Sequence, residues 1–285
     1  MTEEYIRVLI TGARGTIGRI IARNLSGMHM QVVAVTRQQY DIACQKDFSR
    51  MMDDIKPTVI IHCAAEGVKR TIQFNQQHLL NNLQMAENIA VHSHKLKHIF
   101  NLGSGAEYGI KHNLNSVTES SLERFPLPDD EYGLSKRLSW QRLKFTGNST
   151  NLRVFGCFDP SEPDYRLMRR FVNFTSNPTV EFNLETNRRF SWISGNDLSK
   201  VVLWAIKKKL SFDPSMPDEI NVAYPETADL MLSDILDKWC NIHGKDKSYT
   251  APVETNNAYT CDSKLMMSLI NQPLDGLEKS LKDYV

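Results

Sequence analysis

Short apolar runs alternate with helical apolar periods through the first half of the chain. The runs Arg7–Thr11 and Thr58–Ala64 are rich in apolar residues, which is typical of strands buried on both faces of a parallel sheet. Ile17, Ile20 and Leu25 recur at helical spacing. The same reasoning predicts strands over 31–36, 98–102, 151–155 and 219–223, and helices over 47–55, 79–90, 132–145 and 198–208. We therefore expect an α/β fold built on a doubly wound parallel sheet.

The pattern loosens after Phe155. Residues 156–190 contain Pro160 and Pro163 and predict loops with one helix over 165–175, and the tail predicts two or three short helices. We expect two domains, a sheet domain formed by residues 1–155 plus 191–224 and a smaller C-terminal cap formed by residues 156–190 plus 225–285.

Composition narrows the classes of function. The 285 residues are 41% hydrophobic, and 34 Lys and Arg against 33 Asp and Glu leave no global field that would recruit nucleic acid or an anionic membrane. No apolar run approaches the ~20 residues that a membrane span requires, and the acidic start of the chain is unlike a signal peptide. The five cysteines are scattered and form no CxxC pair, so we expect reduced thiols, a cytoplasmic protein and no metal site.

A glycine-rich turn joins the first predicted strand to the first predicted helix. Its sequence is Gly12-Ala-Arg-Gly15-Thr-Ile-Gly18. Glycines in this context permit a tight turn and a close backbone approach, and the amino terminus of the helix attracts a pyrophosphate. A generic tight turn is the competing interpretation, and the flanking strand and helix favour dinucleotide binding.

Tyr132 and Lys136 lie four positions apart on a predicted helix, and therefore on one of its faces. A phenol is a poor acid–base group at neutral pH, and a neighbouring ammonium favours its ionised form. Such a pair occurs by chance in many helices, so its meaning depends on the rest of the chain.

The glycine turn and the Tyr-x-x-x-Lys pair together resemble the short-chain dehydrogenase/reductase superfamily, in particular its extended branch that modifies nucleotide sugars. Further segments match that branch in order, namely Thr58–Ala65, Asn82–Asn88, Leu102–Gly109, Arg153 and Arg189–Asp197. The resemblance implies a Rossmann-type sheet domain that binds NADP and a cap that binds a nucleotide sugar.

The resemblance also implies a catalytic set of Ser104, Tyr132 and Lys136. Tyr132 would protonate the alkoxide that forms as hydride reaches a ketone carbon, and Ser104 would hydrogen-bond the same oxygen. Lys136 would hold the nicotinamide ribose.

Charge near the second strand bears on the choice of cofactor. That strand ends in Thr36-Arg37 without an acidic residue, and Arg14 lies in the glycine turn, so both guanidinium groups could pair with a 2′-phosphate. The two arginines could instead be solvated, but their placement resembles the NADPH-using GDP-fucose synthase group. We expect NADPH, with contacts from Gly12, Arg14, Gly15, Thr16, Ile17, Gly18, Arg37, Asp41, Ile42, Ala64, Ala65, Asn82, Tyr132 and Lys136.

Two small residues after the serine restrict the reaction. The 4,6-dehydratases of this branch carry Asp-Glu there, and GDP-fucose synthase has an epimerising cysteine, whereas this chain has Gly105 and Ala106. Hydride transfer remains, so we expect an NADPH-dependent reductase of a nucleotide-diphospho-4-keto-6-deoxy sugar, serving surface polysaccharide synthesis. The alternatives are a nucleotide-sugar 4-epimerase that retains NAD and a non-catalytic NADP-binding regulator.

Substrate binding and assembly follow from the same resemblance. Arg189 is the candidate contact to the sugar-nucleotide diphosphate, although Arg188 or Arg189 could simply solvate a strand. In many members of the superfamily the helix that holds Asn82 and the helix that holds Tyr132 pair between subunits, so we expect a homodimer, although a single buried core would use the same residues.

Overall fold

The computed structural model describes residues 6–28, 30–67, 75–176, 182–211, 216–246, 249–253 and 257–285. Six strands form one parallel sheet in the order β2-β1-β3-β4-β6-β9. Their bounds are β1 Arg7–Thr11, β2 Gln31–Ala34, β3 Val59–His62, β4 His98–Ser104, β6 Ser149–Val154 and β9 Glu219–Val222. The predicted α/β fold with a doubly wound parallel sheet is therefore confirmed, with the strand at 31–36 shorter than predicted.

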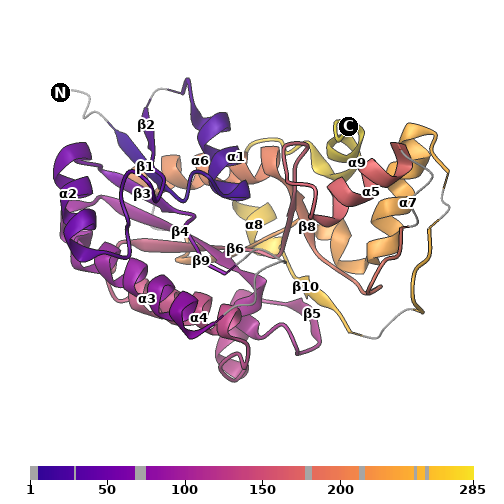
Figure 1. Ribbon diagram of the computed structural model, residues 1–285, viewed down its shortest axis with the longest axis horizontal. Helices are drawn as coiled ribbons and strands as arrows, with labels where there is room; N and C mark the ends of the chain where they lie inside the picture. The colour runs from indigo at the N-terminus through magenta and orange to yellow at the C-terminus, as the bar shows by residue number, and fades with distance from the viewer. Residues whose placement is uncertain are drawn as a thin grey trace.

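Helices cover both faces of this sheet. Figure 1 shows α1 and α6 on one side and α3 and α4 side by side on the other. The bounds of the helices around the sheet are α1 Thr16–Leu25, α2 Gln45–Ile55, α3 Gln76–Val91, α4 Glu131–Lys144 and α6 Gly195–Leu210.

The two cores explain why the strands are apolar without alternation. Val8 and Ile10 of β1 pack into the apolar cluster that contains α1 and α6 residues. Leu9 points the other way, into the cluster that contains Met85 of α3 and Trp140 of α4. Because successive side chains leave a strand on opposite faces, both faces of β1 must be apolar.

The C-terminal half adds a second group of helices and several short strands, seen beside the sheet in Figure 1. These elements are β7 Gly156–Phe158, α5 Leu167–Ser176, β8 Trp192–Ser194, α7 Leu232–His243, β10 Tyr259–Cys261, α8 Lys264–Leu269 and α9 Gly276–Lys282. Strand β10 pairs with β5 (Leu114–Val117) from the first half. Short 3-10 helices cover Ser93–Lys95, Gly105–Tyr108, Glu119–Arg124 and Pro225–Asp229.

The C-terminal tail differs from its prediction. The sequence predicts only short helices there, but the structure places a strand, β10, ahead of the last two helices. Apolar residues of α1, α5, α6, α7 and α9 belong to one continuous cluster. The division into a sheet domain and a cap stays a prediction.

The strand order sets the position of a binding crevice. From β1 the chain goes first to β2 at the sheet edge and then to β3 on the other side of β1. The connections therefore diverge at the carboxyl ends of β1 and β3, where parallel α/β sheets bind ligands.

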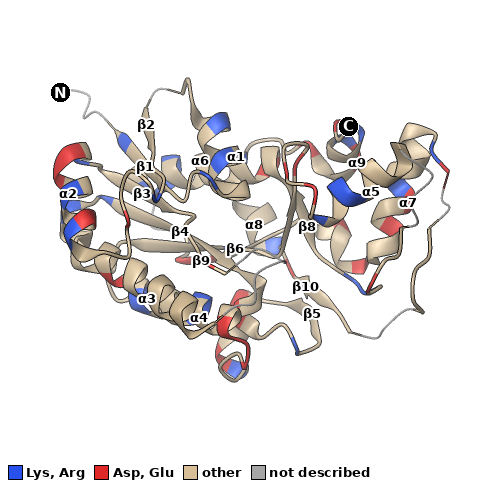
Figure 2. Cartoon of the chain, viewed as in Figure 1, with Lys and Arg blue, Asp and Glu red and all other residues tan. Residues whose placement is uncertain are grey.

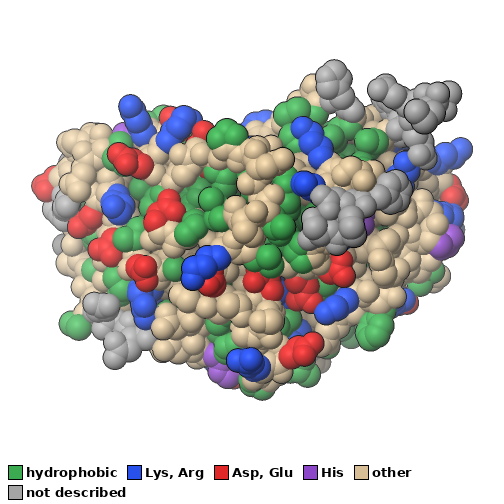
Figure 3. All heavy atoms as spheres, turned by 180° about the vertical axis from the view of Figure 1, so that it is seen from behind, with side chains coloured by type: hydrophobic (Ala, Val, Ile, Leu, Met, Phe, Trp, Pro, Cys, Tyr) green, Lys and Arg blue, Asp and Glu red, His purple; other side chains and the backbone are tan. Residues whose placement is uncertain are grey.

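Charged side chains of both signs are spread along the chain (Figure 2) and over the face shown in Figure 3. The described helices include none with the length and apolar character of a membrane span. Among the described residues, no group of three or more His, Cys, Asp or Glu side chains could hold a metal ion.

Candidate active site

A cavity of about 920 Å³ opens at the carboxyl ends of the central strands. It begins at the glycine turn after β1, passes the loop after β3, and reaches Ser104 at the end of β4. Tyr132 and Lys136 of α4 also line it. The other predicted residues in its wall are Gly12, Arg14, Gly15, Thr16, Ile17, Gly18, Arg37, Asp41, Ile42, Ala64 and Ala65.

The glycine turn forms a cradle that side chains would fill. Gly12 has a φ of +69°, and a Cβ atom on it would lie 2.6 Å from the Ala64 backbone. A Cβ atom on Gly18 would collide with the Gly12 carbonyl oxygen. Helix α1 begins after Gly15 with no side-chain cap and no acidic residue in its first turn. Its open N–H groups suit an anion, so these residues fit the pyrophosphate of a dinucleotide.

Ser104 is held by the short 3-10 helix that follows β4. Its backbone N–H donates to Glu107 Oε1 at 2.9 Å, and its hydroxyl oxygen accepts from the Ala106 N–H at 3.2 Å. Ser104 is buried except for 8% of its surface. The reciprocal pair of bonds fixes the serine where strand and helix meet.

A buried ion network stands behind Ser104. The Glu107 carboxylate, with no exposed surface, pairs with the Arg153 guanidinium at 2.5 Å, and Arg153 also pairs with Glu219. Burial alone would lower the pKa of Arg153, but the two carboxylates raise it. Glu107 therefore holds Ser104 in place. Its carboxylate oxygens already accept hydrogen bonds from Ser104, Asn151 and Arg153.

Helix α4 presents the tyrosine and the lysine from one face. The helix begins after Asp130, whose side chain accepts from the Gly133 N–H at 2.7 Å. The Lys136 ammonium is largely buried and donates to the Leu102 carbonyl of β4 at 2.8 Å. Burial, and secondarily the Lys136 charge, lowers the pKa of the nearby His62 to about 3. His62 is therefore a neutral core histidine, bonded to the Thr11 hydroxyl at 2.9 Å.

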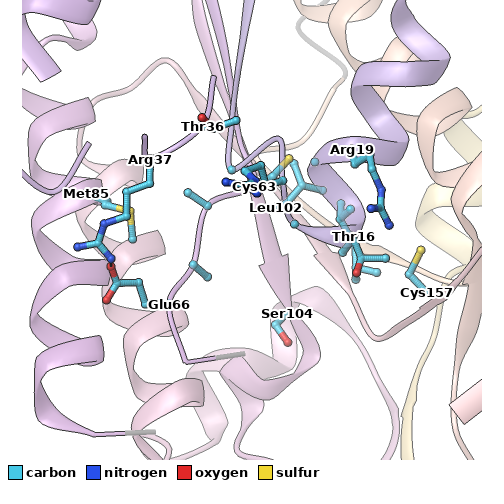
Figure 4. Close-up of a pocket in the computed structure, with 18 of the residues that line it drawn as sticks. Thr16, Arg19, Thr36, Arg37, Cys63, Glu66, Met85, Leu102, Ser104 and Cys157 are labelled. Atoms are coloured by element: carbon cyan, nitrogen blue, oxygen red, sulfur yellow. Dashed lines mark hydrogen bonds and ion pairs between the residues drawn. The ribbon is translucent and has the colours of Figure 1, made fainter. Parts of the chain in front are cut away.

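The part of the cavity wall that follows β2 holds two carboxylates as well as Arg37. Arg37 pairs with Asp41 at 3.2 Å and with Glu66, as Figure 4 shows for Glu66. Arg14 is exposed at the same cavity. Glu66 was not among the predicted residues, although it directly follows the Ala64-Ala65 pair.

Two predicted residues are not among those that line the cavity. Asn82 is buried and bonds the Glu66 N–H at 2.8 Å and the Ser135 hydroxyl at 3.3 Å, so it ties the β3–α3 loop to α4. Arg189 accepts the Tyr259 N–H at its backbone carbonyl. The neighbouring Arg188 guanidinium lies over the Tyr259 ring at 5.3 Å.

The structure adds residues that the sequence did not suggest. Pro163, Tyr165 and Arg166, just before α5, line the cavity on the side of the C-terminal half. Tyr259 of β10 lies beside the residue after Ser104, because a Cβ atom on Gly105 would lie 2.8 Å from the Tyr259 hydroxyl oxygen. The triplet Tyr259–Cys261 has a strand-like composition, but no spacing in the sequence connects it to Ser104.

Comparison with known proteins identifies the family of this site. The model of the NAD dependent epimerase/dehydratase family matches residues 8–223, a range that holds the glycine turn and the Ser104, Tyr132 and Lys136 set. The chain belongs to the NAD dependent epimerase/dehydratase family. This confirms the predicted resemblance to the nucleotide-sugar branch.

Relatives within this group have several activities. An Arabidopsis thaliana protein named "Putative GDP-L-fucose synthase 2" is 28% identical over 203 residues, which are 64% of this chain and 61% of that one. The match thus spans about six-tenths of the relative's length. A dTDP-4-dehydrorhamnose reductase from Bacillus anthracis, solved in complex with NADP, has a TM-score of 0.79 at 16% identity and covers 100% and 99% of the two chains.

A third protein shows that enzymes named for different reactions share this fold. A dTDP-glucose 4,6-dehydratase from Bacillus anthracis in complex with NAD has a TM-score of 0.76 at 14% identity and covers 98% of this chain and 95% of its own. The side chains at the site must decide between such activities.

Proposed function

We propose that this protein is an NADPH-dependent reductase of a nucleotide-diphospho-4-keto-6-deoxy sugar, acting in surface polysaccharide precursor synthesis. The observation that carries the proposal is the arrangement of Ser104, Tyr132 and Lys136 along one dinucleotide-sized cavity. The similarity to proteins named GDP-L-fucose synthase and dTDP-4-dehydrorhamnose reductase supports it.

The chain's own residues have separate tasks in the proposed reaction. The glycine turn and the start of α1 bind the cofactor pyrophosphate, and Lys136 holds the ribose beside the nicotinamide. A bound cofactor supplies hydride to the C4 carbonyl carbon. Tyr132 donates its phenolic proton to the carbonyl oxygen, so that hydride and proton together convert the ketone to an alcohol. Ser104 donates a hydrogen bond to that oxygen as negative charge develops on it.

The surroundings of Ser104 argue against dehydration. A side chain at Gly105 would collide with the Phe155 ring and approach the Tyr259 hydroxyl, so the position has no room for an acidic group. Ala106 cannot transfer a proton. Glu107, the next residue, is ion-paired with Arg153 in the interior. Water elimination needs an acid and a base that these three positions do not supply.

One observation favours a second candidate. Asp41 and Glu66 flank Arg37, and carboxylates at this end of a cavity suit the ribose hydroxyls of NAD better than a 2′-phosphate. A nucleotide-sugar 4-epimerase, which oxidises and re-reduces C4 on a retained NAD, is therefore the alternative. A non-catalytic NADP-binding regulator would bind the cofactor and turn over nothing.

The test is a substrate screen with a catalytic control. Wild-type protein and Tyr132→Phe are incubated with NADPH and 4-keto-6-deoxy sugars carried on GDP, dTDP, CDP and UDP, and absorbance of NADPH is followed. We expect the wild type to consume NADPH with at least one sugar, and Tyr132→Phe to bind NADPH without consuming it. NAD that co-purifies and is released on denaturation would identify the epimerase, and consumption by neither protein would contradict the reductase.

Three further proposals concern the diphosphate contact, the oligomeric state and the location of the protein. Arg189 stays our proposed diphosphate contact, and the alternative is that Arg188 or Arg189 only solvates a strand. We also propose a homodimer formed by α3 and α4. The cytoplasm remains the proposed location.

A further inference from the structure

One arginine reaches the cavity from the C-terminal half of the chain. Arg166 lies directly before α5 and lines the cavity, and its side chain is 35% exposed. The other Lys and Arg residues that line the cavity in the described part of the chain belong to the first half, namely Arg14, Arg19, Arg37 and Lys136. The glycine turn and the start of α1 already fit the cofactor pyrophosphate. Arg166 is therefore available to a second anion.

Two hydrogen bonds fix the Arg166 guanidinium. Its Nε donates to Glu162 Oε2 at 3.0 Å, and its Nη2 donates to the Cys157 carbonyl at 2.5 Å. Within the described part of the chain these are the hydrogen bonds that the guanidinium makes. A guanidinium has five N–H donors, so three remain for a ligand. Because its plane is fixed in advance, it can bond phosphate oxygens in pairs at a low cost in ordering.

Glu162 is itself held from the interior. It is 5% exposed, and its second carboxylate oxygen, Oε1, accepts from the Tyr284 hydroxyl at 2.7 Å and from the Arg169 N–H at 3.2 Å. Both carboxylate oxygens therefore have partners, as a buried carboxylate requires. The bond from Tyr284 fixes the carboxylate that in turn fixes Arg166.

Tyr284 is anchored by the helices of the C-terminal half. It has no exposed surface, and its carbonyl accepts from Trp239 Nε1 of α7 at 2.7 Å. Its ring centroid lies 6.0 Å from that of Phe158 and 5.2 Å from the Arg169 guanidinium carbon. Tyr284 and Glu162 are 122 positions apart in the sequence, so only the fold brings them together. A continuous set of contacts thus runs from Tyr284 in the core to Arg166 at the cavity.

We propose that Arg166 binds a phosphate group in the diphosphate of the sugar nucleotide, and that Glu162 and Tyr284 are positioning residues that hold its guanidinium for this contact. The inference rests on the proposed function for the identity of the substrate, and it holds for reduction and epimerisation alike. A diphosphate has two phosphate groups, so Arg166 and Arg189 can both contact it.

The test measures binding and needs no turnover. Protein saturated with NADPH is titrated in a calorimeter with GDP, dTDP, CDP and UDP, and the tightest of these is compared with its own nucleoside, which has no phosphate. The variants are Arg166→Met, Glu162→Gln and Tyr284→Phe, and Arg166→Met combined with each of the other two. The matched control is Arg124→Met, at an exposed arginine that does not line the cavity.

The expected result is a loss of affinity that depends on the phosphates. Arg166→Met should raise the Kd for the nucleoside diphosphate about tenfold, the size of one lost hydrogen-bonded charge contact. Its Kd for the nucleoside and for NADPH should stay within about twofold of wild type, and Arg124→Met should change none of the three. An unchanged Kd for NADPH also shows that a variant is folded.

The positioning residues should act through Arg166 only. Glu162→Gln and Tyr284→Phe should raise the Kd for the nucleoside diphosphate about fivefold and about threefold, because the guanidinium loses its orientation and keeps its charge. In the Arg166→Met background neither should raise it further. Equal losses in the two backgrounds would refute the positioning role.

Four other outcomes decide the contact itself. Absence of nucleoside-diphosphate binding by the wild type, or equal weakening of nucleoside and nucleoside diphosphate in Arg166→Met, would overturn it. Weaker NADPH binding with unchanged nucleoside-diphosphate binding would assign Arg166 to the cofactor pyrophosphate and would also overturn it. If the wild type reduces no sugar in the screen but the Arg166-dependent binding is present, the proposed reductase fails and the inference stands. If the wild type is active and Arg166→Met binds nucleoside diphosphates normally, the inference fails alone.

Discussion

At the scale of single residues, Arg37 is our proposed contact to the ribose end of the cofactor. The Arg37 side chain is 62% exposed, and its guanidinium forms ion pairs with Asp41 and Glu66. A 2′-phosphate would have to draw Arg37 away from one of them and would then face that carboxylate at close range. Glu66 is itself fixed, because Asn81 donates to its other carboxylate oxygen at 2.7 Å. Glu66 thus opposes the cofactor that we propose.

Removing the Glu66 charge should therefore strengthen the binding of NADPH. We expect Glu66→Gln to lower the Kd for NADPH about threefold to fivefold, the size of one exposed ion-pair contribution, and to leave the Kd for NADH unchanged. Titration calorimetry measures both values. The control is Glu123→Gln, an exposed carboxylate that does not line the cavity. Weaker NADPH binding by Glu66→Gln would show that the 2′-phosphate does not lie beside Arg37.

At the scale of elements, the sequence predicted the strands of the central sheet and the longer helices around it. Apolar runs predicted β3, β4, β6 and β9 to within a few residues. Helical periods did the same for α2, α3, α4 and α6. Strands β5, β7, β8 and β10 were missed. They lie outside the central sheet, in two small sheets of two strands each, and their partners are distant in the chain.

The same limit explains what could be foreseen of the site. The glycine turn and the Tyr132–Lys136 pair have fixed local spacing, so a motif reveals them. Tyr259 lies beside Gly105 because β10 pairs with β5, a contact between residues far apart in the chain. Glu66 lay next to a recognised pair, but its partner Arg37 belongs to another loop.

The pairing of β4 with β6 leads to a pH-dependent stability. At the start of β4, His98 bonds the Thr150 hydroxyl of β6 at 2.9 Å, and burial lowers its pKa from 6.5 to about 4. Below pH 6.5 the unfolded chain binds a proton that folded His98 does not bind. The stabilisation is therefore complete above pH 6.5 and is lost as the pH falls toward 4.

We expect the free energy of unfolding in urea to decrease between pH 6.5 and pH 4, on the order of 3 kcal/mol for one such histidine. His98→Gln should remove part of this decrease, because glutamine does not titrate. His94→Gln, at an exposed histidine close in the chain, should keep the wild-type profile. An unchanged pH profile in His98→Gln would contradict a neutral buried His98.

At the scale of the whole molecule, the cavity lies between elements of the two halves of the chain. Gly12, Ser104 and Lys136 come from the first half, whereas Pro163, Tyr165 and Arg166 come from the segment before α5. One apolar cluster continues from the sheet into the C-terminal helices, so both walls of the cavity are supported by the same core. Helices α3 and α4 lie side by side on the face of the sheet opposite α1 and α6 (Figure 1).

The proposed dimer would bury the outer surface of α3 and α4. Leu80 of α3 is 57% exposed, and Phe145, at the end of α4, is 87% exposed. We expect the wild type to have the mass of a dimer in light scattering, and Leu80→Arg to shift it to the monomer, because a charge in an apolar interface is costly. Val253→Arg, at an 89% exposed apolar residue outside these helices, is the control. A monomeric wild type would contradict the proposed dimer.

The central claim, hydride transfer to C4 with Tyr132 as the acid, is tested most directly by an isotope label. The protein is supplied with NADPH that is stereospecifically deuterated at the nicotinamide C4, in turn on each face, and with the sugar found in the screen, and the product is examined by NMR. The account predicts deuterium at C4 of the sugar with one of the two labels, and none with Tyr132→Phe. In D₂O with unlabelled NADPH it predicts no deuterium at the carbons beside C4. A product without label at C4, or with solvent deuterium at its neighbours, would contradict simple reduction.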